Sequence, residues 1–214
     1  MTKILVVDDH AVVRHGVKQI LSEQFPDAAV GEAQNAEDML HQVRQHRWDI
    51  VVLDVGMPGK GGLDALKDLK QLHPKLPVLV LSAYPEDQLA LRMLKAGAAG
   101  YLSKDSAPNE LVQAIRKILG GGIFVSASVA ELLALNVKSA LETPLHEQLS
   151  DREYQVLCLI AVGKSLKEIA DDLSVSVSTV NTYRARILEK MQLKNNTEIT
   201  HYAIENRLVN RLVT

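Results

Sequence analysis

Short apolar runs alternate with amphipathic stretches over the first 120 residues, and this alternation restricts the fold more than any other feature. The runs are rich in β-branched residues and bounded by turn residues, which is typical of strands buried on both faces of a parallel sheet. They are Ile4–Val7, Ala28–Val30, Ile50–Leu53, Val78–Leu81 and Gly100–Leu102. Apolar stripes at helical spacing lie between them, at Val13–Leu21, Leu63–Leu72 and Leu111–Ile118. Strand–helix alternation repeated five times predicts a doubly wound α/β domain with a five-stranded parallel sheet.

Only helix signals continue from residue 150 to the end of the chain. Two segments, Ser150–Glu153 and Ser165–Glu168, fit the capping box, in which serine and glutamate side chains satisfy backbone N–H groups at a helix start. Ser176 is the expected cap of a third helix, which runs to about Met191, and a fourth helix follows Thr197. This part therefore predicts a small all-α domain of four helices.

A weaker pattern separates these two parts. Gly120–Gly122 ends the last amphipathic stretch, because glycine loses the most backbone entropy when it is ordered. The residues that follow contain one short helical pattern, Ser128–Leu135, and then Pro144. We therefore expect a first domain at residues 1–120, a linker with a short helix at 121–148 and a second domain at 149–214.

Composition sets limits on function. The 214 residues carry 24 Lys+Arg against 26 Asp+Glu, a formal charge of -2, so the overall charge does not point to nucleic acid. The single cysteine, Cys158, excludes an internal disulfide, and its apolar neighbours favour a buried, inert thiol. No apolar run approaches the ~18–20 residues that cross a bilayer, and the first run is too short for a signal peptide. These features predict a cytoplasmic protein with no membrane partner.

Residues that carry chemistry follow the predicted strands. Asp8 and Asp9 follow the first strand and Asp54 the third, and these strands are neighbours in the 2-1-3-4-5 order. Three carboxylates that converge repel one another unless a cation neutralises them, and Mg²⁺ prefers such oxygen ligands. Ser82 after the fourth strand and Lys104 after the fifth add a hydroxyl and an ammonium. The set predicts a phosphate site in which one carboxylate acts as nucleophile and forms an acyl phosphate.

These residues, with the segment Asp54–Gly59, resemble the receiver domain of bacterial two-component response regulators in identity and in order. The resemblance implies a flavodoxin-like fold and phosphorylation by a sensor histidine kinase. It implies these roles: Asp54 as phosphoacceptor; Asp8, Asp9, Asp54 and the Gly56 carbonyl as Mg²⁺ ligands; Ser82 as switch hydroxyl; Lys104 as phosphate counter-charge; Tyr101 as aromatic switch. Asp105 follows Lys104 where many receivers have proline, which leaves the geometry of this loop open.

The same residues fit two other functions less well. A phosphatase of the haloacid-dehalogenase type needs a second carboxylate two positions after Asp54, where Gly56 stands. A dinucleotide site needs glycine-rich backbone after the first strand, whereas Asp8 and Asp9 would repel a pyrophosphate. His10 lies beside the acidic residues, and a surface role is expected for it in preference to ligation. A non-enzyme is thus favoured, with a phosphatase and a receiver that serves only for constitutive dimerisation as alternatives.

The segment from Ser165 to Met191 predicts a helix, a turn at Val175–Ser176 and a second helix. Burying the apolar stripe of the second helix leaves a polar face that suits the major groove of DNA, where asparagine and threonine reach bases and basic residues meet phosphates. The predicted DNA-binding residues are Ser178, Thr179, Asn181, Thr182, Arg184, Ala185, Arg186 and Lys190. On charge alone, a solvated helix face is the favoured explanation of this pattern.

Segments Leu149–Glu153, Gly163–Ala170 and Ser178–Tyr183 resemble the LuxR-type helix-turn-helix. Together with the receiver, nearly the whole chain resembles a NarL/FixJ-family response regulator, and Thr179–Arg186 is similar to the GacA branch. The resemblance implies transcription regulation by a protein that dimerises on activation and binds paired half-sites of double-stranded DNA. The implied pairing residues on the last helix are Ile199, Tyr202 and Ala203, although packing within the domain core would explain the same apolar stripe.

Overall fold

The computed structural model describes residues 1–57, 62–83, 86–138, 144–206 and 208–209. The chain divides into two compact units, Met1–Leu133 and Ala134–Thr214. Among the described residues, no helix combines the length and the apolar character that crossing a membrane would require.

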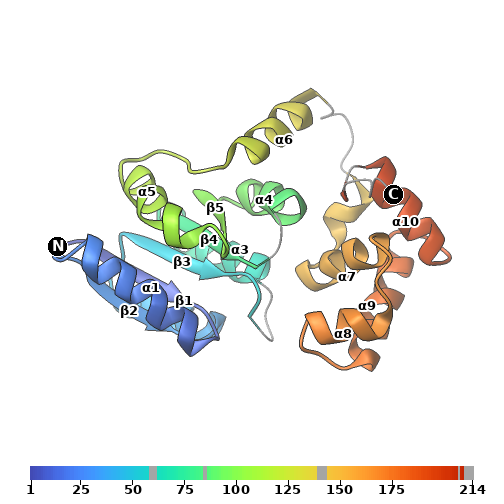
Figure 1. Cartoon of the computed structure of the whole chain (residues 1–214), viewed down its shortest axis with the longest axis horizontal. Coiled ribbons are helices and arrows are strands. Elements are labelled where there is room, and N and C mark those ends of the chain that lie inside the picture. The colour runs from blue at the N-terminus through green and yellow to red at the C-terminus, as the bar shows by residue number, and fades with distance from the viewer. Residues whose placement is uncertain (58–61, 84–85, 139–143, 207, 210–214) are drawn as a thin grey trace. The chain divides into compact units, whose positions relative to one another are not determined.

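The first unit is built on a five-stranded sheet in which every pairing is parallel. Its strands are β1 (Lys3–Val7), β2 (Ala29–Ala33), β3 (Ile50–Asp54), β4 (Val78–Ser82) and β5 (Gly100–Ser103). Their order is β2-β1-β3-β4-β5, so the predicted fold class and strand order are confirmed (Figure 1). Because all strands run the same way, their carboxyl ends meet at one edge of the sheet.

Helices cover both faces of this sheet (Figure 1). They are α1 (Ala11–Gln24), α2 (Ala36–Gln45), α3 (Gly62–Leu72), α4 (Glu86–Lys95) and α5 (Ala107–Leu119). The helices α1 and α5 pack together on one face, and α2, α3 and α4 lie in succession on the other. On the α1 and α5 face, alternate strand residues and the helix stripes form one buried core of Ile4, Val6, Val17, Leu21, Ile50, Val52, Leu79, Leu81, Leu102, Leu111, Ile115 and Ile118. Burial of β3 and β4 on both faces explains their continuous apolar runs.

The chain beyond α5 stays attached to the first unit. The amide of Phe124 donates to the Ala99 carbonyl over 2.9 Å, and the amide of Tyr101 donates to the Phe124 carbonyl over 3.2 Å. Phe124 therefore pairs with the side of β5 that does not face β4. Gly100 permits this approach, since a Cβ there would lie 2.8 Å from the Phe124 carbonyl oxygen. For this reason the compact unit continues past Gly120, where the sequence places the end of the first domain.

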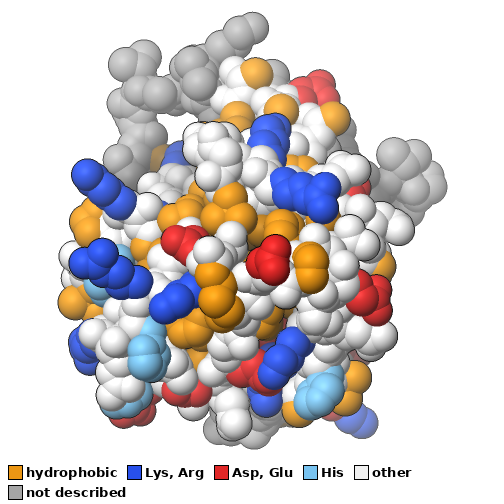
Figure 2. Space-filling model, turned by 90° about the vertical axis from the view of Figure 1, so that its left-hand side faces the viewer, with side chains coloured by type: hydrophobic (Ala, Val, Ile, Leu, Met, Phe, Trp, Pro, Cys, Tyr) orange, Lys and Arg blue, Asp and Glu red, His pale blue; other side chains and the backbone are white. Residues whose placement is uncertain are grey.

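The end of the sheet at which the strands begin is basic. The loops before β3 and β4 line a groove with the side chains of Arg44, His46, Arg47, His73 and Lys75. Figure 2 shows this end of the unit, where Lys, Arg and His side chains, with Asp and Glu side chains among them, surround apolar ones. The predicted acidic site belongs to the opposite end, at which the strands finish.

The second unit consists of helices. Helix α6 (Ala127–Lys138) crosses the division between the units and includes the predicted short helix, and a 3-10 turn, η1 (Leu145–Gln148), precedes α7 (Asp151–Ala161). They are followed by α8 (Leu166–Asp172), α9 (Val177–Lys190) and α10 (Asn196–Glu205). The predicted caps Ser150, Ser165 and Ser176 are confirmed, the first two as capping boxes. The thiol of Cys158 is buried, as expected.

Candidate functional site

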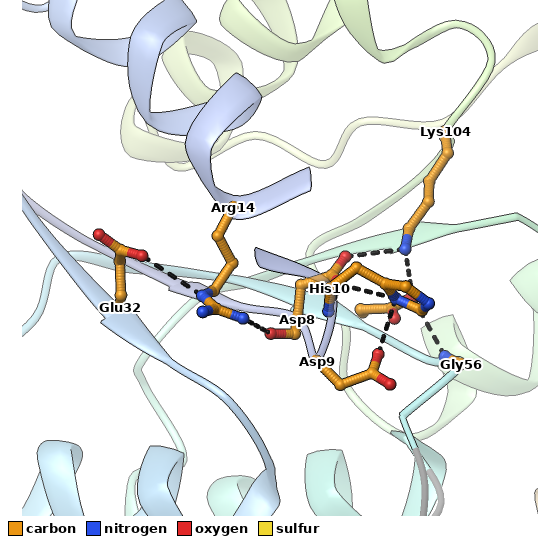
Figure 3. A network of polar contacts seen from close by, with 8 residues as sticks. Asp8, Asp9, His10, Arg14, Glu32, Gly56 and Lys104 are labelled. Atoms are coloured by element: carbon orange, nitrogen blue, oxygen red, sulfur yellow. Dashed lines mark hydrogen bonds and ion pairs between the residues drawn. The ribbon is translucent and has the colours of Figure 1, made fainter. Parts of the chain in front are cut away.

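The structure brings the predicted acidic residues together at the carboxyl ends of β1 and β3 (Figure 3). Ligand atoms of Asp8, Asp9, His10 and Asp54 all lie within 4.8 Å of one another. Asp8 and Asp54 are each only 2% exposed, whereas Asp9 is half-buried. The site is therefore an acidic pocket with two buried carboxylates and a more open rim.

Lys104 supplies the positive charge of this acidic pocket. Its Nζ lies 2.7 Å from Asp8 Oδ2 and 3.2 Å from Asp54 Oδ1. Burial by itself disfavours the ammonium, but the Asp54 and Asp8 carboxylates outweigh it and raise the pKa of Lys104. One cation thus bridges two buried anions and holds the ends of β1, β3 and β5 in contact.

The carboxyl of Asp54 retains one unsatisfied oxygen. Its Oδ1 accepts a hydrogen bond from the Gly56 amide at 3.1 Å, while Oδ2 is buried and has no hydrogen-bond partner among the described residues. Burial raises the pKa of Asp54; the Asp8 charge acts in the same direction, and Lys104 opposes both. A buried, unpaired carboxylate oxygen beside two further carboxylates fits a hard divalent cation, because such ions take oxygen ligands.

The loops after β4 and β5 are tied together. The Lys104 amide donates to the main-chain oxygen of Ser82 over 2.7 Å, and the Ser82 side chain is fully buried. All peptide bonds of the described residues are trans, and the Asp105 amide donates to the Ser103 hydroxyl. The loop that the sequence left open therefore forms a turn stabilised by this hydrogen bond.

The remaining predicted receiver residues lie at or near the same edge. Tyr101 is fully buried on β5, two residues before Ser103, which ends the strand. Gly56 follows β3 directly, and its carbonyl as a metal ligand stays a prediction, as do the switch roles of Ser82 and Tyr101. Of the predicted loop, Pro58 and Gly59 lie outside the described residues.

Sequence reasoning missed a partly buried ion pair beside the site. Arg14 of α1 is 8% exposed, and its Nη1 donates to the main-chain oxygen of Asp8 over 2.7 Å (Figure 3). Its Nε lies 3.3 Å from the Glu32 carboxylate on β2, which also binds Lys18 at 2.8 Å. The Lys18 hydrogen bond, supported by Arg14, lowers the pKa of Glu32. This network holds the backbone of Asp8 in place. In the sequence, Arg14 lies three residues before the apolar Val17, and this helical spacing indicates that Arg14 lies on the buried face of the helix.

His10 lies at the surface, as expected, and also beside the carboxylates. The side chain is 64% exposed, yet its Nδ1 lies 2.9 Å from Asp9 Oδ1 and 3.2 Å from Asp8 Oδ1. Its amide also donates to Asp8 Oδ1 over 2.8 Å. The imidazole is thus accessible to solvent and turned toward the carboxylates at the same time.

In the second unit, α8 and α9 form the predicted helix-turn-helix. The turn places Ser174 in the left-handed region, with φ 52°, and the Val175 amide returns to the Ala170 carbonyl over 3.0 Å. Val180 and Ile187 of α9 are buried, as is Met191 directly after the helix. Of the predicted DNA-binding residues, Ser178, Asn181, Thr182, Ala185, Arg186 and Lys190 are exposed, and Thr179 and Arg184 are half-buried.

Two of these basic side chains are engaged within the unit. Nζ of Lys190 lies 2.6 Å from a carboxylate oxygen of Glu153, which is 2% exposed and also accepts from the Ser150 amide. Burial opposes ionisation, but the hydrogen bonds from Lys190 and Ser150 prevail and lower the pKa of Glu153. The Nε of Arg184 donates to the side chain of Asn196 at the start of α10. Lys190 therefore fastens α9 to α7, and Arg184 fastens α9 to α10.

The residues predicted to pair two protomers do not form an exposed surface. Ile199 and Ala203 are fully buried within the unit, on a helix that packs against α7. Tyr202 is half-buried, and its hydroxyl lies 3.1 Å from Nδ1 of His146. Packing in the domain core, the other explanation of this stripe, accounts for Ile199 and Ala203, because buried side chains offer no surface to a second protomer.

Two family models match the chain. Residues 4–116 match the response regulator receiver domain, and residues 147–203 match the bacterial regulatory proteins of the luxR family. A receiver fold with an acidic pocket, followed by a LuxR-type helix-turn-helix, defines the class of response regulators with a DNA-binding domain.

Known proteins resemble the chain over nearly its whole length. It is 37% identical to the response regulator UvrY of Escherichia coli strain K12 over 212 residues, which are 98% of this chain and 97% of UvrY. It is 38% identical to the response regulator GacA of Pseudomonas aeruginosa over 210 residues, 98% of each protein. The structure of RcsB from Salmonella enterica serovar Typhimurium, bound to promoter rprA in the presence of phosphomimetic BeF3-, matches with a TM-score of 0.60 at 25% identity, over 94% of this chain and 97% of that one. The chain belongs to the NarL/FixJ family of two-component response regulators.

Proposed function

We propose that a sensor histidine kinase phosphorylates Asp54 and that the phosphoryl group controls sequence-specific DNA binding through α9, and thereby transcription. The observation that carries this proposal is the buried Asp54 carboxyl with its unpartnered Oδ2, set between two further carboxylates and the Lys104 ammonium. Membership of the response-regulator family supports a regulatory role in preference to turnover. Such a protein acts in the cytoplasm, where its DNA lies.

In the proposed reaction, the ionised Asp54 carboxylate attacks the phosphorus of the phosphorylated histidine of the kinase; an O–P bond forms as the N–P bond breaks, the kinase histidine leaves as imidazole, and Asp54 becomes an acyl phosphate. Mg²⁺ held by Asp8, Asp9, Asp54 and the Gly56 carbonyl would neutralise charge on the phosphoryl oxygens. Lys104, already 3.2 Å from Asp54, is placed to pair with one of these oxygens. Desolvation in the pocket strengthens that pairing, since charges interact more strongly away from water.

The signal would leave the pocket through β4 and β5. Lys104 would turn from Asp8 toward the phosphoryl group, and its loop would move with it. The hydrogen bond from the Lys104 amide to the main-chain oxygen of Ser82 would transmit this movement to the end of β4. Tyr101, which is buried on β5 just before that loop, would change its position together with the Ser82 hydroxyl. The phosphoryl group thereby favours one of two receiver states, which is a shift of populations. In the favoured state the protein pairs as a homodimer on double-stranded DNA, as RcsB does in the solved structure of two RcsB dimers bound to two parallel DNAs.

Labelling with acetyl phosphate tests the receiver half of the proposal. We expect Mg²⁺-dependent incorporation of about one phosphoryl group per chain, absent in Asp54→Asn and retained in Asp105→Asn, which removes an exposed carboxylate close to the pocket. No labelling of the parent protein would overturn the proposal and favour a receiver that serves only for dimerisation. Release of many equivalents of phosphate per chain would favour a phosphatase.

DNA binding by matched variants tests the second half. Arg186→Ala removes an exposed charge from α9 and should weaken binding to any duplex, with the salt slope falling by roughly 1. Asn181→Ala should instead reduce the preference for one site over another. The control Arg47→Ala removes an exposed charge from the first unit, far from α9 in the sequence. If both α9 variants bind like this control, α9 is not the recognition helix.

A further inference from the structure

The imidazole of His10 takes the position of a metal ligand in the acidic pocket. Figure 3 shows the ring directed at Asp8 and Asp9, and Nδ1 lies 2.9 Å from Asp9 Oδ1 and 3.2 Å from Asp8 Oδ1. Two atoms that bind one small cation at about 2.1 Å and at right angles to each other are about 3.0 Å apart. The spacing within the cluster is therefore that of neighbouring ligands on one ion.

The buried oxygen of Asp54 marks the same place. Oδ2 of Asp54 is buried, has no hydrogen-bond partner among the described residues and belongs to a carboxylate of this cluster. Asp8 is already committed, because Oδ1 accepts the His10 amide and Oδ2 pairs with Lys104. The carboxylates with oxygens left for an ion are thus those of Asp54 and Asp9, and Nδ1 of the imidazole would exchange its hydrogen bond to Asp8 Oδ1 for the ion.

The backbone holds His10 in this orientation. His10 is the N-cap residue of α1 and has an extended backbone, with φ -86° and ψ 110°. Its amide is anchored to Asp8, whose own main-chain oxygen is held by Arg14. The imidazole therefore projects from a rigid turn, which lowers the entropy lost when it binds an ion.

We propose that Nδ1 of His10, together with carboxylates of Asp9 and Asp54, binds a first-row transition-metal ion such as Ni²⁺ or Zn²⁺. The inference rests on the metal site of the proposed function. Mg²⁺ prefers oxygen ligands, whereas imidazole nitrogen favours the later first-row ions. His10 consequently sets the affinity of the pocket for this second class of ion and contributes little to the binding of Mg²⁺.

Calorimetric titration of the full chain with Ni²⁺ and with Mg²⁺ tests the proposal. In His10→Phe we expect Ni²⁺ affinity to fall about tenfold or more and Mg²⁺ affinity to change by less than about threefold. The matched control is His15→Phe, an exposed histidine of α1 outside the cluster, which should bind both ions like the parent. A retained Mg²⁺ affinity also shows that the pocket of the variant is folded.

Pulsed electron paramagnetic resonance of bound Mn²⁺ reads the ligation directly. Mn²⁺ occupies oxygen-rich sites, and nitrogen coupling to it should be present in the parent and in His15→Phe and absent in His10→Phe. Coupling that persists in His10→Phe, or an equal loss of Ni²⁺ and Mg²⁺ affinity, overturns the proposal while phosphorylation of Asp54 stands. A parent protein that binds neither ion overturns both the inference and the metal-dependent function.

Discussion

Asp54 should lower the stability of the metal-free receiver, and Asp54→Asn should raise it. Burial, reinforced by Asp8 and opposed by Lys104, raises the pKa of Asp54 above its unfolded value. A raised carboxyl pKa means that ionised Asp54 destabilises the folded receiver above its folded pKa, and that this cost disappears as pH falls through it. The asparagine side chain keeps the shape and removes the charge, so the variant should also lose this pH dependence.

The magnitude follows from the contacts of Asp54. A buried oxygen without a donor, such as Oδ2, costs about 1–3 kcal/mol. Loss of the Lys104 contact at 3.2 Å offsets part of the gain, although Lys104 keeps Asp8 at 2.7 Å. We therefore expect Asp54→Asn to stabilise the metal-free receiver by about 1 kcal/mol at neutral pH.

Mg²⁺ should reverse this order. An ion that binds only the folded receiver, at a hundred times its dissociation constant, adds about 2.7 kcal/mol of stability. The parent gains this in full, while the variant gains less because one carboxylate ligand is missing. The parent should consequently be the less stable protein in chelator and the more stable one in saturating Mg²⁺.

Tryptophan fluorescence during urea denaturation measures this reversal. The chain has one tryptophan, Trp48, which is half-buried in the first unit and therefore reports on the receiver alone. Asp105→Asn, an exposed carboxylate, serves as control and should stay within about 0.5 kcal/mol of the parent. A variant less stable than the parent in chelator, or equal stabilisation of both by Mg²⁺, would refute the reasoning.

Two further predictions concern packing. Lys190→Met leaves the buried Glu153 carboxylate without its cation and should destabilise the second unit by about 1–3 kcal/mol. The figure is reduced from that of a fully buried pair because Lys190 is 39% exposed. Because the folded pKa of Glu153 is lowered, the deficit should shrink as pH falls through it. Circular dichroism follows the helices of both units and Trp48 fluorescence follows the first alone, so a melt seen only by circular dichroism belongs to the second unit, and an unchanged melt of that unit at neutral pH would contradict the assignment. Gly31→Ala places a Cβ against the Trp48 ring, so the ring must move; we expect a shifted emission and a loss of about 1–3 kcal/mol, and an unaltered spectrum would show that the contact is absent.

The sequence is most informative where the signal is local or repeats along the chain. Apolar runs at strand spacing predict the sheet, and serine followed three residues later by glutamate predicts where α7 and α8 begin. Convergence of Asp8 and Asp54 follows from strand order alone, since parallel neighbours end at one edge. These features need no knowledge of which side chains meet across the fold.

Contacts between distant residues are what the sequence conceals. Lys190 reads as an exposed base on a helix that faces DNA, and only the fold places the buried Glu153 beneath it. Ile199 and Ala203 form the same stripe whether a second protomer or α7 covers it. The orientation of the His10 ring depends on the backbone of a single turn, which spacing does not encode.

The pairing of Phe124 with β5 bears on how the receiver can be separated from the rest of the chain. β5 is the last strand of the sheet, and Phe124 pairs with its outer side at the Tyr101 amide. Exposed strand edges invite pairing with other molecules and hence aggregation. A receiver fragment cut at Gly120 would lose this bridge, whereas one cut after Ser126 would keep it. The few residues between Gly120 and Ser126 thus protect the edge of the sheet from pairing with other molecules, and we expect the longer fragment to be the more soluble one.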